Sequence, residues 1–250
     1  SGIGEATAKL YASRGASVVL LARSQDRLER VAAEIKQAGG TASSYPVDLA
    51  DSGAVEALCA RIGRELGTPD ILVNNAGAGQ WLPLLETSAA QAREMVEVPY
   101  LAAFYVTRAF LPAMIARASG RIACITSPAS YLVWPNACAY IAARHALAGF
   151  TEALRTEMRG KGIAVTLVVL GTVESPYWEH NPGSRENVPK TNQMLMPTLT
   201  PSEAAETIMA AIEKKQRLAV QPWLFRLLFL LNALMPRLVA AQLRRASKKS

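Results

Sequence analysis

Three side chains near the middle of the chain have types and spacing that suit acid–base chemistry at an oxygen atom. Ser127 follows a short apolar run, while Tyr140 and Arg144 lie four residues apart in a helix-favouring segment and so share one helix face. A phenol ionises at about pH 10 in water, so it is a poor acid or base at neutral pH unless a nearby cation stabilises its phenolate. Arg144 supplies such a cation one turn away. The Ser127 hydroxyl can hold a carbonyl or hydroxyl oxygen in place.

Two predicted elements position these residues. Residues 121–126 form an apolar run short enough for a buried strand, and residues 139–158 are long enough and helix-favouring enough for a helix. Between them lie Ser127, Pro128, Ala129 and Ser130, small turn-forming residues at the carboxyl end of the strand. Ligands bind at that edge of open parallel sheets, so we expect the three side chains to converge on one crevice.

The composition suits a single α/β domain. The chain has 250 residues, of which 50% are hydrophobic and 19% are charged, so it is neither disordered nor fibrous. Strand-like runs alternate with helical segments over residues 1–220, which predicts a Rossmann-like doubly wound parallel sheet in a three-layer α/β/α arrangement. Residues 221–250 are predicted to form an apolar and basic helical extension of the same domain.

The chain begins with a glycine-rich turn, Ser1-Gly2-Ile3-Gly4, which runs into a predicted helix. Such a turn normally follows a strand, so we expect this fold to lack its first strand and half of its phosphate loop. Backbone N–H groups at the start of a helix, with glycines that permit close approach, favour a pyrophosphate group.

Cysteine, histidine and charge exclude several classes of function. Cys59, Cys124 and Cys138 show no paired or metal-like spacing, which predicts reduced thiols in a cytoplasmic protein. His145 and His180 are too scattered for a metal site, so no metal is expected. The net charge is +7, and much of the excess comes from basic residues near the C-terminal end. These residues do not alternate regularly with aromatic residues, so a nucleic-acid partner is not expected either.

Several of these features occur together, and in the same order, in a known family. Tyr140 follows Ser127 by 13 residues, and the run Asn74-Asn75-Ala76-Gly77 lies at the end of a predicted strand. With the glycine-rich turn, these residues make the chain resemble the short-chain dehydrogenase/reductase family up to about residue 220. The resemblance implies an oxidoreductase with a nicotinamide cofactor. In it, Tyr140 passes a proton to a substrate carbonyl and Ser127 orients the oxygen.

The resemblance also implies which residues hold the cofactor. Arg23 follows the predicted strand at 17–22, where an acidic residue would hold a ribose 2′-hydroxyl and an arginine matches a 2′-phosphate. NADP is therefore favoured over NAD; the alternative for Arg23 is an exposed arginine ahead of the next helix. The residues expected to bind the cofactor are Ser1, Gly2, Ile3, Gly4, Arg23, Ser24, Asp48, Leu49, Asn75, Ala76, Gly77, Tyr140, Arg144, Gly171 and Val173.

Two positions depart from the family pattern. Arg144 stands where the family has a lysine; it stays charged and can donate to the nicotinamide ribose, but it does not easily relay a proton. Pro99 stands where the family has an asparagine that holds a water, and it predicts a kink in the helix expected over residues 91–118. Ser127, Tyr140 and Arg144 remain the expected catalytic residues.

Three functions therefore stay open. One is an NADP(H)-dependent oxidoreductase that interconverts an apolar alcohol and its ketone or aldehyde. Another is a catalytically impaired relative that acts as a nucleotide-binding or scaffold module. The third is a membrane-surface interaction module led by the C-terminal tail.

Other segments suggest the substrate and partners. The apolar loop 131–134 and the methionines Met194 and Met196 predict a small apolar substrate, and residues 176–199 resemble a lid over it. The family commonly pairs the two helices expected here over 91–118 and 139–158, so the resemblance implies a homodimer or homotetramer.

Residues 222–249 follow helical spacing and end in basic residues. Their uninterrupted apolar part is too short to span a bilayer, which takes roughly 20 residues. A peripheral helix on anionic lipid is one prediction for this tail. A helix packed on a partner subunit or on the substrate pocket is the alternative.

Overall fold

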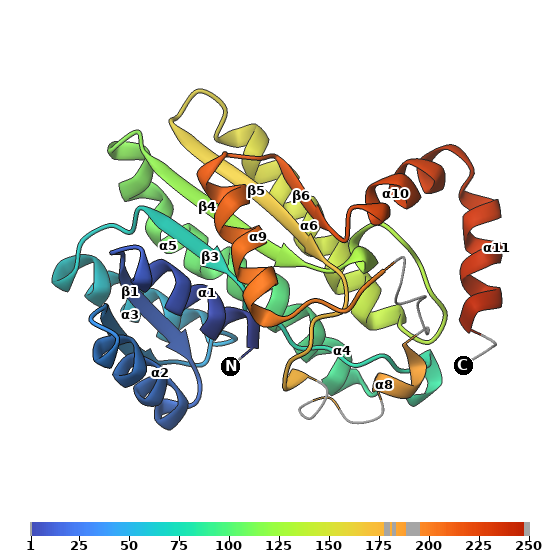
Figure 1. Cartoon of the computed structure of the whole chain (residues 1–250), viewed down its shortest axis with the longest axis horizontal. Helices are drawn as coiled ribbons and strands as arrows, with labels where there is room; N and C mark the ends of the chain where they lie inside the picture. The colour runs from blue at the N-terminus through green and yellow to red at the C-terminus, as the bar shows by residue number, and fades with distance from the viewer. Residues whose placement is uncertain (1, 178–180, 182–183, 189–195, 248–250) are drawn as a thin grey trace.

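The computed structural model describes residues 2–177, 181, 184–188 and 196–247. Strands alternate with helices along the chain, as the sequence predicts (Figure 1). The strands are β1 (Ser17–Ala22), β2 (Thr41–Pro46), β3 (Ile71–Asn74), β4 (Gly120–Thr126), β5 (Ile163–Leu170) and β6 (Leu218–Gln221). The helices are α1 (Gly2–Ser13), α2 (Gln25–Gln37), α3 (Ser52–Glu65), α4 (Ala89–Val96), α5 (Ala102–Ala116), α6 (Cys138–Glu157), α8 (Ser184–Asn187), α9 (Pro201–Glu213), α10 (Leu224–Leu234) and α11 (Pro236–Ser247).

The strands form two parallel sheets, one of order β1-β2 and one of order β3-β4-β5-β6. The predicted Rossmann-like fold is therefore confirmed, with a division between β1 and β3. In a doubly wound sheet of strand order 3-2-1-4-5-6, these are the two strands that flank the first one.

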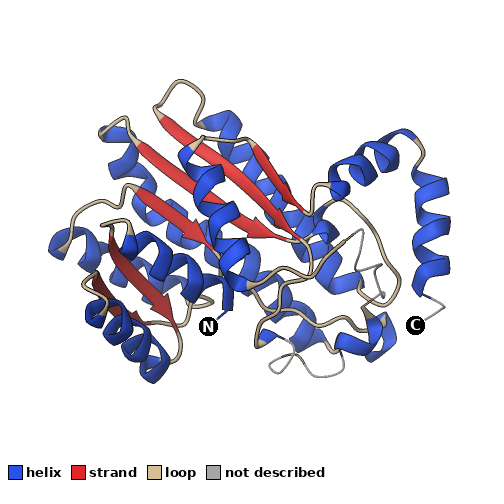
Figure 2. Ribbon diagram, in the orientation of Figure 1, coloured by secondary structure: helices blue, strands red, loops and turns tan. Residues whose placement is uncertain are grey.

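Helices cover both faces of the strands (Figure 2). On β4, Ala123 and Ile125 pack on the side of α9, whereas Cys124, between them, packs on the side of α6. The same alternation continues along β5. Both faces of these strands are buried, which is why their sequences read as continuous apolar runs rather than as alternating ones.

The long helix predicted over 91–118 is interrupted at Pro99. Ser88 and Gln91 form a capping box at the start of α4, and a π-turn over Glu97–Leu101 then joins α4 to α5. Because proline lacks an N–H, the regular hydrogen-bond ladder cannot continue there. The distortion that Pro99 predicts is thus seen as a π-helical stretch within one helical span. No side chain at position 99 can hold a water.

One helical span, Ala89–Ala116, is long and apolar enough to cross a membrane by length and composition alone. Its buried side chains, among them Met95, Phe110 and Met114, lie in core clusters of this chain. These residues pack as in a core helix, and 39% of the apolar window of the span is buried.

Candidate active site

The ends of β4 and α6 bring Ser127 and Tyr140 into contact. Ser127 directly follows β4 and caps the 3-10 turn Pro128–Ser130, where its Oγ accepts a hydrogen bond from the Ala129 N–H at 3.3 Å. The Tyr140 hydroxyl, from the first turn of α6, donates to the same Oγ at 3.0 Å. Because Ser127 Oγ accepts two hydrogen bonds, its own proton is available to a substrate oxygen.

Buried hydroxyl groups hold the strand end to the helix. Ser130 Oγ donates to the Arg144 carbonyl oxygen at 3.0 Å, and it lies 2.6 Å from Thr126 Oγ1. A hydroxyl has a single proton, so Thr126 is the donor in the second pair. These buried bonds tie β4 to α6 and so help to set the distance between Ser127 and Tyr140.

Arg144 places a buried cation against the phenol ring. Its side chain is only 7% exposed, and its Cζ lies 4.7 Å from the centroid of the Tyr140 ring, within the range of a cation–π interaction. Nη2 donates to the Ala78 carbonyl oxygen at 3.3 Å, whereas the buried Nε has no hydrogen-bond partner among the described residues. A buried donor of this kind is costly when unpaired, so it suits a site that holds a bound group.

The loop after β3 approaches both side chains through glycines. A Cβ added at Gly77 would lie 3.3 Å from Arg144 Nη2, and one added at Gly79 would lie 2.6 Å from Tyr140 Cδ2. Gly79 also has a φ of +147°, a conformation that L side chains rarely adopt. Ala76, which precedes them, is half-buried. Only small residues allow this loop to lie so close to the phenol and the guanidinium.

Trp81 forms an aromatic wall that the sequence did not single out. Its ring centroid lies 5.6 Å from that of Tyr140 and 5.8 Å from that of Trp134. The position of Trp81 four residues after the Asn-Asn-Ala-Gly run was the available signal. Together with Trp134, it gives the phenol apolar surroundings.

Tyr177 is a second phenol at the site that sequence reasoning missed. Its hydroxyl donates to the Gly79 carbonyl oxygen. Burial raises the pKa of Tyr177 and the nearby Tyr140 phenol raises it further, while Arg144 opposes both. Tyr177 is therefore a neutral hydrogen-bond donor, and no local pattern in its own segment could have revealed this contact.

Part of the predicted lid over 176–199 contacts the Trp81 loop. Ser184 Oγ accepts a hydrogen bond from the Trp81 N–H at 3.2 Å, and Asn187 Nδ2 donates to the Trp81 carbonyl oxygen at 2.9 Å. The short helix α8 thus holds both main-chain groups of Trp81. Residues 178–180, 182–183 and 189–195 of this segment lie outside the described residues.

The start of α1 lies against the segments that follow β3 and β5. A Cβ added at Gly4 would lie 2.8 Å from Asn75 Nδ2, and one added at Gly2, whose φ is +56°, would lie 3.0 Å from Ser175 Cβ. Ser1 lies outside the described residues. The structure thus gathers three segments at one edge of the strands, and the open N–H groups of a helix start suit a pyrophosphate there.

The side chains predicted to meet the adenosine half follow β1 and β2. Arg23 and Asp48 are both exposed, and Asp48 Oδ1 accepts from the Ala50 N–H at 3.0 Å. Ser24 caps α2 without a side-chain hydrogen bond, and Leu49 packs against a core cluster. An exposed guanidinium at the end of β1 is placed to meet a phosphate, whereas Leu49 offers chiefly its main chain.

Three further residues predicted to bind the cofactor have packing roles. Ile3 and Val173 contact the core cluster beneath α9. The Gly171 N–H donates to the Gln221 carbonyl oxygen at 2.8 Å, and a Cβ there would lie 2.9 Å from Pro222 Cδ. Their contact with a cofactor stays a prediction, and Ile3 and Gly171 are only partly buried.

The apolar loop 131–134 links the site to the C-terminal helices. The Tyr131 ring stacks on Phe229 of α10 with centroids 4.6 Å apart, and Met196 packs in the same cluster. Met194 lies outside the described residues. The loop predicted to face the substrate therefore shares its apolar packing with α10.

Comparisons with known proteins agree with this geometry. A model of the short chain dehydrogenase family matches residues 1–185. An uncharacterized oxidoreductase of Mycobacterium tuberculosis is 35% identical over 228 residues, which cover 89% of this chain and 64% of that protein. The chain thus spans less than two thirds of that relative's length. A fatty acyl-CoA reductase of Acinetobacter baylyi is 34% identical over 219 residues, covering 87% of this chain and 71% of that protein.

Two solved structures are similar over nearly the whole length. An alcohol dehydrogenase from Thermococcus sibiricus, complexed with 5-hydroxy-NADP, has a TM-score of 0.75 at 27% identity and covers 88% of this chain and 90% of its own. A metagenomic short-chain oxidoreductase in complex with NADP has a TM-score of 0.73 at 30% identity and covers 88% and 91%. Fold, site geometry and the family match lead to one conclusion: this chain belongs to the short-chain dehydrogenase family, a family of oxidoreductases.

Proposed function

We propose that this protein is an NADP(H)-dependent oxidoreductase that interconverts an apolar alcohol and its ketone or aldehyde by hydride transfer, with Tyr140 as the acid and base. The observation that carries this proposal is the 3.0 Å hydrogen bond from the Tyr140 hydroxyl to Ser127 Oγ, beside the buried guanidinium of Arg144.

Each side chain has a distinct part in the proton transfer. In reduction, the Tyr140 hydroxyl gives its proton to the carbonyl oxygen, while the free proton of Ser127 Oγ holds the same oxygen. The phenolate that forms is stabilised by the Arg144 cation beside the ring. In oxidation, the phenolate takes the alcohol proton. Bound NADPH supplies the hydride for reduction, and bound NADP⁺ accepts it in the reverse direction.

Residues on this chain fit NADP. Arg23 offers an exposed guanidinium for the 2′-phosphate, and Gly2 and Gly4 allow a pyrophosphate to approach the start of α1. The unpartnered Nε of Arg144 is a buried donor for the nicotinamide half. The NADP and 5-hydroxy-NADP in the two similar structures support the same choice.

An apolar substrate is supported by the walls of the site. Trp81 and Trp134 flank Tyr140, and the loop 131–134 continues into the apolar cluster with α10. One relative is a fatty acyl-CoA reductase, and a fatty acyl group is apolar, which supports the same class of substrate. We infer that the protein is cytoplasmic, because the free thiols of Cys59, Cys124 and Cys138 suit a reducing compartment. We also infer that it forms a homodimer or homotetramer.

The test begins with calorimetric titration of NADPH and NADH, followed by NADPH oxidation assays on aldehydes of increasing chain length. We expect NADPH to bind more tightly than NADH and the longer aldehydes to react faster. Tyr140→Phe should lower kcat by roughly 10²–10⁴-fold, because the proton donor is lost. Tyr105→Phe, on α5 against Phe104, is the matched control. Absence of nucleotide binding, or full activity in Tyr140→Phe, would refute the proposal.

A second candidate is a nucleotide-binding or scaffold role without catalysis. It is favoured by Pro99, which has no side chain for a relay water, and by Arg144, whose Nη2 is already engaged by Ala78. This candidate predicts NADPH binding without turnover. It also predicts no gain when Arg144→Lys and Pro99→Asn are combined. A gain of activity in the double variant would instead show that these two departures limit an existing reaction.

A further inference from the structure

We propose that α10 and α11 form a docking surface for an anionic lipid bilayer. The two helices lie together at one end of the molecule, beyond the carboxyl ends of the strands (Figure 1). The inference goes beyond the proposed reaction and does not depend on it. It rests on an exposed apolar stripe, an inner face that holds the stripe outward, and a strong local excess of positive charge.

The stripe, Trp223, Leu227, Leu230 and Leu234, runs along α10. Its members are spaced four, three and four residues apart, so they fall on one side of the helix. Trp223 is 69% exposed and Leu234 is 68% exposed, and Met235 and Leu238 continue the exposed apolar surface toward α11. A run of large exposed apolar side chains, led by a tryptophan, is typical of surfaces that bind a partner or a membrane interface.

The opposite side of α10 faces the protein core. Phe225 is buried, Phe229 stacks on Tyr131, and Asn232 Nδ2 donates to the Tyr131 carbonyl oxygen at 3.0 Å. These contacts fix the rotation of α10 about its axis. The stripe therefore stays on the outer side, since turning it inward would break the packing of Phe225 and the Asn232 hydrogen bond.

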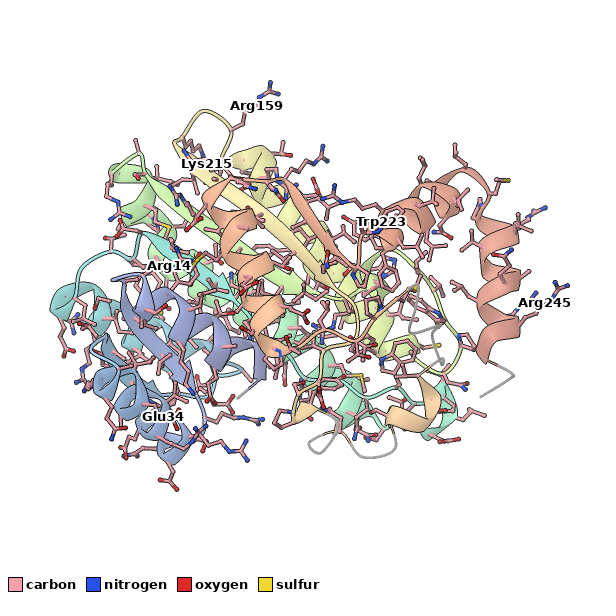
Figure 3. All side chains as sticks on the ribbon, in the orientation of Figure 1. Arg14, Glu34, Arg159, Lys215, Trp223 and Arg245 are labelled. Atoms are coloured by element: carbon pink, nitrogen blue, oxygen red, sulfur yellow. The ribbon has the colours of Figure 1, made fainter. Side chains whose placement is uncertain are left out.

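The segment that forms these helices carries charge of one sign. Residues 214–250 contain nine Lys and Arg and no Asp or Glu, whereas the other 213 residues contain 18 Lys and Arg against 20 Asp and Glu. The whole positive excess of the chain thus belongs to this segment. Arg237, Arg244 and Arg245 of α11 are exposed, and Figure 3 shows Arg245 extending outward from that helix.

A groove lies on the flank of the stripe. It has a volume of about 550 Å³ and is lined by Gln216, Arg217, Leu218, Arg226 and Phe229. Arg217 is paired with Glu152 at 2.9 Å, whereas the exposed Arg226 donates only to the Leu218 carbonyl oxygen among the described residues. Arg226 immediately precedes Leu227, so its guanidinium borders the apolar side chains. This arrangement matches the boundary of a bilayer, where acyl chains meet phosphate groups.

The positive charge of this segment favours a bilayer over a second copy of this chain as the partner of the surface. In a symmetric contact each helix pair would face its own counterpart, which brings arginine against arginine with no carboxylate in the segment to pair with them. Anionic headgroups supply the missing negative charge. Docking there would also bring loop 131–134, on the substrate side of the site, near a source of apolar molecules.

The test is co-sedimentation of the full chain with phosphatidylcholine vesicles and with vesicles that contain about one third phosphatidylglycerol. We expect binding to the anionic vesicles that weakens with added salt. The triple variant L227S/L230S/L234S should lower the partition coefficient at least tenfold, because it removes the apolar stripe. The matched control, L66S/L84S/L85S, changes three exposed leucines on other elements and should bind as the wild type does.

Charge variants test the second requirement. R237Q/R244Q/R245Q should lose the preference for anionic vesicles, while R14Q/R64Q/R159Q, with the same change of charge, should keep it. Arg14 and Arg159 lie away from α11 in Figure 3.

Three results would overturn the proposal. They are no binding by the wild type, equal loss in a control variant, or a dimer in sedimentation velocity that only the stripe variant dissociates. The last would assign the stripe to a second copy. Melting followed by circular dichroism verifies that each variant is folded.

Discussion

At the scale of single residues, the site depends on a glycine as much as on its reactive groups. A Cβ at Gly79 would lie 2.6 Å from Tyr140 Cδ2, so Gly79→Ala must displace the phenol ring. We expect kcat/KM to fall by about tenfold or more, which corresponds to about 1.4 kcal/mol of lost transition-state stabilisation. Steady-state kinetics with the preferred aldehyde measures this.

Gly149, on the same helix as Tyr140, is the matched control because a Cβ there meets nothing within 4 Å. Gly149→Ala should leave kinetics unchanged and raise the free energy of unfolding by about 0.5–1 kcal/mol, since alanine favours a helix more than glycine does. Unchanged kinetics in Gly79→Ala as well would mean that the ring tolerates the displacement.

What the sequence predicts at this scale depends on how near the partners are in the chain. Tyr140 and Ser127 are 13 residues apart, and local strand-turn-helix geometry brings them together as predicted. Tyr177 and Gly79 are 98 residues apart. No periodicity or spacing in the sequence predicts such a contact, because the contact depends on how β3 and the segment after β5 pack in three dimensions.

At the scale of elements, an ionic cluster joins α1 to α2. Glu5 receives hydrogen bonds from Lys9 at 2.6 Å and from Arg30 at 2.8 Å, and Lys9 and Arg30 also pair with Glu34. Burial alone would raise the pKa of Glu5, but the bonds from Arg30 and Lys9 outweigh it and lower the pKa to about 2.

This carboxylate makes stability depend on pH. Its folded pKa lies below its unfolded value of 4.5, so its contribution is full above that value and is lost as the pH falls through about 2. Urea unfolding at a series of pH values should show a shallower acid loss for Glu5→Gln than for the wild type. Glu56→Gln, on α3, should keep the wild-type slope. A slope in Glu5→Gln as steep as in the wild type would contradict the assignment.

Element types were predictable wherever the apolar pattern was long. Local capping also leaves a readable pattern: the capping boxes Ser88–Gln91 and Thr200–Glu203 stand at the starts of α4 and α9. The tail was less predictable: it is two helices that separate at Met235, ahead of Pro236. Its pattern showed helical spacing, but which apolar side faces inward depends on contacts with Tyr131 that lie about 100 residues away.

At the scale of the whole molecule, α1 connects the two sheets. Ala8 and Ala12 pack on β1 and β2, while Ile3 and Tyr11 pack on the cluster of the four-stranded sheet. Helix α1 therefore helps to hold the two sheets together across the division between β1 and β3.

A phenol in that bridge offers a test of its packing. Burial raises the pKa of Tyr11 to about 12, and its buried hydroxyl has no hydrogen-bond partner among the described residues. Tyr11→Phe should raise the free energy of unfolding by about 1 kcal/mol, because it removes an unsatisfied polar group and keeps the ring. Tyr45→Phe, which loses a 2.9 Å bond to Glu65, should not stabilise. Chemical denaturation compares the two, and a loss of stability in Tyr11→Phe would contradict the prediction.

The position of α10 and α11 at one end of the molecule has a kinetic consequence. A positive end joined to a slightly acidic body makes the protein an electric dipole. Near a negatively charged surface such a dipole turns its positive end forward before contact. Counter-ions limit this steering to a distance of about 8 Å at physiological ionic strength and to about 30 Å at low salt. Added salt should then lower the rate constant for association with the membrane more than it changes the rate constant for dissociation. Most molecules that reach the membrane should already have the correct orientation.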